Sequence, residues 1–96
     1  MLHLIAHSLA HSPVLARIST GDSVLFLENA VYDLHQNTPL AVTLRDLGTR
    51  SELYALAPDL RLRGIDPNAL VSGIRCIEDT GFVELTLRHR IIKTWR

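Results

Sequence analysis

The sequence predicts a three-layer α/β domain in which a mostly parallel sheet of about five strands lies between helices. Two observations support this prediction. Short, nearly continuous apolar runs are typical of buried parallel strands, and the segments between them show helical spacing with prolines at their starts and glycines at their ends. With 96 residues, 47% hydrophobic and 21% charged, the chain is expected to form one globular domain over residues 1–96.

The first elements alternate strand and helix. Residues 2–6 form a short apolar run that predicts a strand, and Pro13 starts or limits a brief helix after the following loop. Residues 23–27 form a continuous apolar run after a Gly-Asp turn, which predicts a second strand that is too short to be a helix. Asn29 is expected to cap a helix over residues 30–35, whose apolar side chains share one face.

A further helix and strand occupy the middle of the chain. Thr38 and Pro39 provide a cap and a first helical position, and Gly48 is expected to end that helix in the left-handed conformation. Residues 52–56 predict the third strand. Residues 58–64 repeat the pattern of a proline at the start and a glycine at the end, which predicts a short helix.

The last third of the chain is expected to hold two strands around one helix. Residues 66–73 predict a helical turn, and residues 74–77 predict the fourth strand. The acidic residues in the stretch 78–80 can cap a final helix that includes residues 82–89. Residues 91–95 close the chain as the fifth strand. Strands separated by helical crossovers predict right-handed parallel connections.

Charge is neutral in total but unevenly distributed. Ten basic and ten acidic side chains cancel, and Arg88, Arg90, Lys93 and Arg96 lie in a stretch without an acid. Residues 1–87 therefore carry six basic side chains, ten minus four, against ten acidic ones. This balance is not that of a nucleic-acid-binding domain. For the basic stretch, a solvated sheet edge is favoured over a contact with phosphate or a partner.

The expected location is the cytoplasm. No apolar run approaches the roughly 18 to 20 residues that a membrane helix requires, and no signal peptide is recognisable. The single cysteine, Cys76, cannot form an internal disulfide, which agrees with a reducing compartment.

Three histidines are spaced like the ligands of a metal site on a helix. His3, His7 and His11 follow each other at intervals of four residues. In a strand, however, four residues separate His3 from His7 by about 13 Å, which is too far for one ion. No metal site is therefore expected. The favoured interpretation is that these imidazoles hydrogen-bond to loop backbone or line a subunit contact, which could then depend on pH.

Cys76 is a weak candidate for a persulfide carrier, and a buried, inert thiol is favoured. The thiolate is the nucleophile and sulfur carrier, so it needs nearby cations. Arg75 is adjacent but points to the opposite face of a strand, while Glu78 and Asp79 would raise the thiol pKa. The sequence also lacks Gly-x-Ser-x-Gly, a P-loop and Gly-x-Gly-x-x-Gly, so it predicts neither a catalytic set nor a cofactor.

Several stretches together resemble the TusB/DsrH family of the DsrE-like superfold. The resemblance covers nearly the whole chain in both order and spacing. It is carried by residues 1–4 (MLHL), 21–32 (GDSVLFLENAVY), 53–56 (LYAL), 59–60 (DL), 63–65 (RGI), 73–74 (GI), 77–79 (IED), 81–86 (GFVELT), His89 and 94–95 (TW).

The resemblance implies a subunit of a cytoplasmic sulfur-relay complex, together with TusC-like and TusD-like subunits of the same fold in a dimer of heterotrimers. Such complexes pass persulfide sulfur toward 2-thiolation of the tRNA wobble uridine or, in the Dsr version, through sulfur oxidation. DsrH-type members that carry sulfur have a cysteine in the first helix, and this chain has none before Cys76. The resemblance therefore implies a structural subunit without a catalytic residue.

Three hypotheses follow. The leading one is a TusB-like structural subunit that supports tRNA thiolation, with direct tRNA contact unlikely at zero net charge. The second is that Cys76 itself carries persulfide. The third is a homo-oligomeric interaction module.

Overall fold

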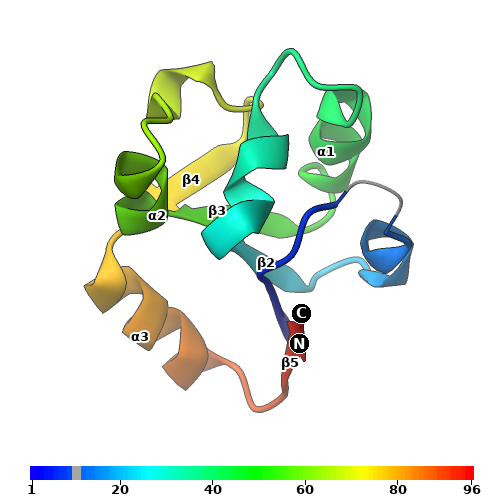
Figure 1. Cartoon of the computed structure of the whole chain (residues 1–96). Coiled ribbons are helices and arrows are strands. Elements are labelled where there is room, and N and C mark those ends of the chain that lie inside the picture. The colour runs from blue at the N-terminus through cyan, green and yellow to red at the C-terminus, as the bar shows by residue number, and fades with distance from the viewer. Residues whose placement is uncertain (10–11) are drawn as a thin grey trace.

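The computed structural model describes residues 1–9 and 12–96 and confirms the predicted α/β class (Figure 1). A five-stranded sheet has the order β4-β3-β2-β1-β5, and all neighbouring strands are parallel. Each strand matches its predicted range to within one residue at either end. The strands are β1 (Leu2–Ile5), β2 (Ser23–Phe26), β3 (Glu52–Leu56), β4 (Ile74–Ile77) and β5 (Ile92–Trp95).

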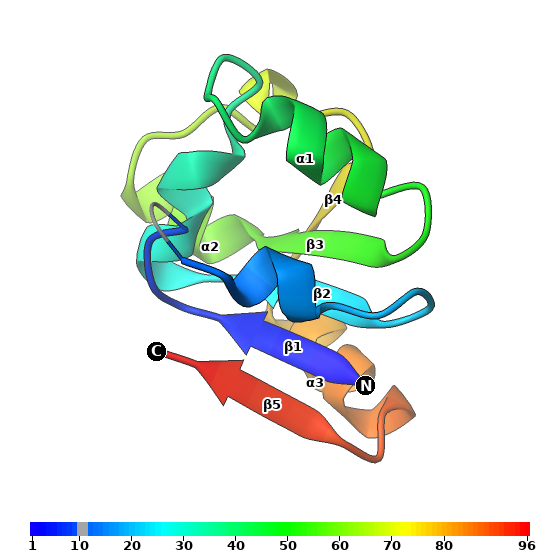
Figure 2. The same ribbon diagram turned by 90° about the vertical axis from the view of Figure 1, so that its right-hand side faces the viewer.

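The chain reverses its direction across the sheet once. From β1 it moves through β2 and β3 to β4, one neighbour at a time, and then returns past three strands to place β5 beside β1. Right-handed crossovers that run in opposite directions must cover opposite faces, so α3 lies on the face opposite η1 and α1 (Figure 2). We call the sheet face beneath α3 the α3 face. The helical segments are η1 (Val14–Arg17), η2 (Glu28–Leu34), α1 (Ala41–Leu47), α2 (Ala57–Leu62), η3 (Pro67–Ala69) and α3 (Asp79–Arg88).

The two faces of the sheet bury unequal cores. The larger core includes Val24 and Phe26 of β2, packed with Leu34, Leu44 and Leu60 from η2, α1 and α2. The smaller cluster lies on the α3 face and consists of Leu2, Leu25, Tyr54, Leu56 and Leu85. Within the described residues, α3 is the sole helix on that face, so the smaller core is less completely covered. No helix of the described residues has both the length and the apolar content to cross a membrane.

The predicted helix over residues 30–35 is the 3-10 helix η2, and its predicted cap is wrong. Asn29 lies inside η2, where its Oδ1 accepts a hydrogen bond from Arg63 Nη2 at 3.4 Å. Glu28, the first residue of η2, has a φ of 52° and donates its backbone N–H to Asp59 Oδ2 at 2.7 Å. The carboxylate of Asp59, on α2, thus binds the helix N-terminus in place of Asn29.

The glycine predictions are partly wrong. Gly48 follows α1 but has a φ of −65°, and its N–H donates to the carbonyl of Leu44 at 2.9 Å, so the chain leaves α1 in a right-handed turn. Thr38 does not cap α1, because its hydroxyl donates to a carbonyl of η2. Gly64 and Gly73 do adopt the left-handed region, with φ of 68° and 97°. Gly64 follows the end of α2 as predicted, whereas η3 already ends at Ala69 and Gly73 lies in the turn before β4, so the prediction that Gly73 ends a helical segment is wrong.

Candidate functional site

Cys76 is exposed, so the prediction of a buried thiol is wrong. It lies on β4, which forms one edge of the sheet next to β3. Strand alternation places Cys76 on the same face as Ile74, which packs against the larger core, and Arg75 on the α3 face. The exposure follows from the edge position, because the two central residues of β4 are both solvent-accessible.

The electrostatics around Cys76 disfavour the thiolate. Partial burial raises the pKa of the Cys76 thiol, and the negative charge of Glu78 raises it further, in the direction that the sequence predicted. Glu78 is held beside β4 by Arg61, whose guanidinium donates two hydrogen bonds of 2.9 Å to the two carboxylate oxygens. The thiol is therefore accessible but weakly nucleophilic near neutral pH.

At the carboxyl ends of the strands, where α/β folds place their ligand sites, polar side chains connect neighbouring helices through hydrogen bonds and an ion pair. Asp59, after β3, binds the Glu28 N–H through Oδ2 and contacts Arg63 through Oδ1 at 3.4 Å. The Arg63 guanidinium also lies 5.8 Å from the ring centroid of Tyr32 in η2. Sequence reasoning gave these residues no role beyond the resemblance, although Asp59 and Arg63 both belong to the matching stretches. Their contacts fix η2 against α2.

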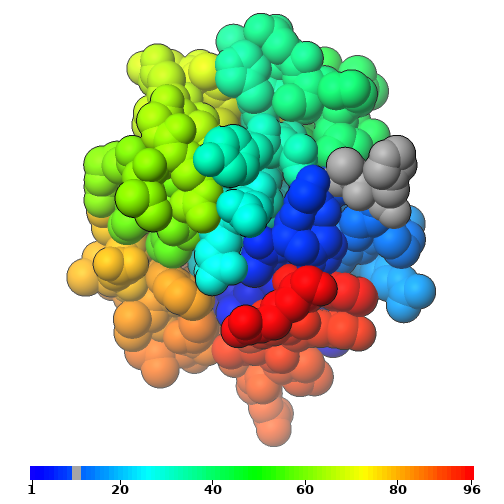
Figure 3. Space-filling view, in the orientation of Figure 1, coloured from blue at the N-terminus to red at the C-terminus, as the bar shows by residue number. Residues whose placement is uncertain are grey.

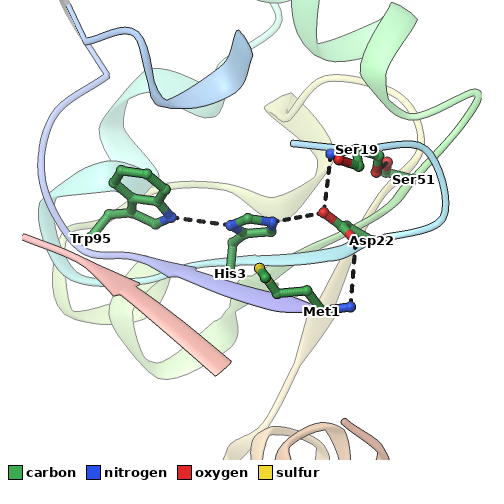
Figure 4. Close-up of polar contacts among 6 residues, drawn as sticks. All are labelled: Met1, His3, Ser19, Asp22, Ser51 and Trp95. Atoms are coloured by element: carbon green, nitrogen blue, oxygen red, sulfur yellow. Dashed lines mark hydrogen bonds and ion pairs between the residues drawn. The ribbon is translucent and has the colours of Figure 1, made fainter. Parts of the chain in front are cut away.

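A partly buried polar network joins the two ends of the chain to the turn before β2 (Figure 4). His3 is 2% exposed, and its Nε2 lies 2.8 Å from Asp22 Oδ2. Trp95 Nε1–H donates to His3 Nδ1 at 3.1 Å. Because an indole nitrogen only donates, Nδ1 must accept, and the ring proton therefore sits on Nε2 and is donated to Asp22. Asp22 also accepts from the Ser19 N–H at 3.0 Å and from the amino group of Met1 at 3.4 Å.

Asp22 is a carboxylate at the centre of this network. Burial alone would raise the pKa of Asp22, but the hydrogen bonds from His3 and the Ser19 N–H, with the charge of the N-terminal amine, lower it overall. The Trp95 ring stacks against His3 with centroids 6.2 Å apart, and the Lys93 ammonium lies 4.3 Å from the Trp95 ring centroid. The network thus fastens β5 to β1 and to the start of β2.

The histidines occupy different environments. His3 hydrogen-bonds side chains, not loop backbone, and it is too buried to line a subunit contact, so both predictions are wrong for this residue. His7 Nε2 lies 3.1 Å from the Ser12 hydroxyl, and its Nδ1 has no partner among the described residues. His11 lies outside the described residues. In the part of the chain that the structure describes, no group of three His, Cys, Asp or Glu side chains is placed to hold a metal ion.

The strand order and the layering define the class of protein: a small three-layer α/β domain with an all-parallel sheet. Residues 6–91 match the family model described as DsrH like protein, and the chain therefore belongs to the DsrH-like family. At family level this makes it a sulfur-relay-related subunit of the kind that acts with partner subunits.

The fold is also similar to that of a solved structure. It is that of a protein of unknown function from Methanobacterium thermoautotrophicum, with a TM-score of 0.76 over 98% of this chain and 96% of that chain. The sequence identity is 16%, so this similarity concerns the fold alone. No curated protein matches the sequence.

Proposed function

We propose that this chain is a structural, non-sulfur-carrying subunit of a cytoplasmic TusBCD-like sulfurtransferase complex that supports 2-thiolation of the tRNA wobble uridine. Its partners are TusC-like and TusD-like subunits, arranged as a dimer of heterotrimers. The family supports the sulfur-relay role. The observation that favours a structural role is that Cys76, the single cysteine of the sequence, has a raised thiol pKa beside a carboxylate.

The chemistry of the relay explains why this observation matters. In each transfer, an acceptor thiolate attacks the terminal sulfur of a donor persulfide. A new S–S bond forms on the acceptor, the old S–S bond breaks, and the donor cysteine leaves as a thiolate. An efficient acceptor therefore needs a cysteine that is deprotonated near neutral pH, which the surroundings of Cys76 oppose. The partner subunits would supply the reactive cysteines.

The test is reconstitution with TusC-like and TusD-like chains from the same organism. Native mass spectrometry is expected to show a hetero-oligomer that contains this chain, and Cys76→Ser is expected to leave both assembly and sulfur transfer to the next carrier unchanged. A monomer or homo-oligomer in the presence of both partners would refute the complex. Loss of transfer in the assembled Cys76→Ser complex would instead make Cys76 the carrier, an alternative that its exposure favours.

The pathway is tested separately. Deletion of the gene is expected to remove 2-thiouridine from the wobble position of tRNA, measured by mass spectrometry of digested tRNA. Unchanged thiolation with a loss of sulfur oxidation would place the subunit in a DsrEFH-type sulfur-trafficking system.

A further inference from the structure

We draw no further inference here: the strongest candidate, the surface patch of exposed apolar residues Val83 and Leu87 on α3 and Ile92 on β5 (orange and red in Figure 3), carries nothing, because nothing in the structure shows what covers it.

Discussion

Replacement of Asp22 by Asn tests whether the network around His3 stabilises the fold through charge. Asp22 Oδ2 accepts hydrogen bonds from His3 and from the Ser19 N–H, at 2.8 and 3.0 Å. An Asn oxygen can occupy the same position and keep both donors, but it is neutral. The Asn Nδ2 group also replaces Oδ1, which accepts from the Met1 amino group at 3.4 Å, and a donor there cannot accept that bond. Hydrogen bonds to charged groups contribute about 1.5–3 kcal/mol and neutral ones about 0.5–1.5, so neutralising one acceptor of two bonds is expected to cost about 2 kcal/mol.

The assay is urea unfolding at pH 7, followed by the fluorescence of Trp95, which is the chain's single tryptophan and contacts His3 directly. For a domain of this size, 2 kcal/mol corresponds to a lowering of the melting temperature by about 10 °C. Asp46→Asn is the control, because Asp46 pairs with Arg50 at the surface of α1 and its loss should cost less than about 0.5 kcal/mol.

The dependence on pH sharpens the test. The folded-state pKa of Asp22 is lowered, so the carboxylate contributes its full stability above the ordinary value of 3.8 and loses that contribution as the pH falls through the folded pKa. The stability difference between native chain and Asp22→Asn should therefore shrink in strong acid. Equal stability of the Asp22 and Asp46 variants at pH 7, or a difference that stays constant into acid, would refute the reasoning.

Two more predictions concern the network and the cysteine. Trp95→Phe removes the donor to His3 Nδ1 inside the core and is expected to cost about 1–3 kcal/mol, measured by circular dichroism; a change below 0.5 kcal/mol would contradict the proposed hydrogen bond. Glu78→Gln removes the carboxylate that raises the Cys76 thiol pKa and should speed iodoacetamide alkylation at pH 7, by less than about tenfold because burial is the larger cause. Glu84→Gln is the control, and equal rates in both variants would contradict a role for Glu78.

The strands could be predicted because their cause is local. The four residues of β2 are all buried, and an apolar run that is too short for a helix and follows a Gly-Asp turn is typical of a buried strand. Helix type and capping were less predictable, because they depend on distant groups. Asn29 has the chemistry of a cap, but Asp59, 30 residues later in sequence, reaches the same helix end once α2 packs beside η2.

The features of the candidate site were likewise predictable from the sequence only where their cause is local. The effect of Glu78 on Cys76 acts within two residues, so its direction could be predicted from the sequence. The exposure of Cys76 could not, because it depends on β4 being an edge strand, which the order of strands decides. The His3 network joins positions 19 and 92 residues apart, and no spacing rule connects them.

The network also determines how firmly β5 is held at the edge of the sheet. This strand pairs with β1 alone, and Trp95 at its end is hydrogen-bonded to His3 on the face opposite the α3 face. An edge strand held only by one ladder of hydrogen bonds would fray at its ends. The hydrogen bond from Trp95 and its stacking on His3 order β5. The replacement of Trp95 by Phe should therefore loosen β5 before the rest of the sheet, and amide hydrogen exchange in residues 92–95 should rise more than in β3.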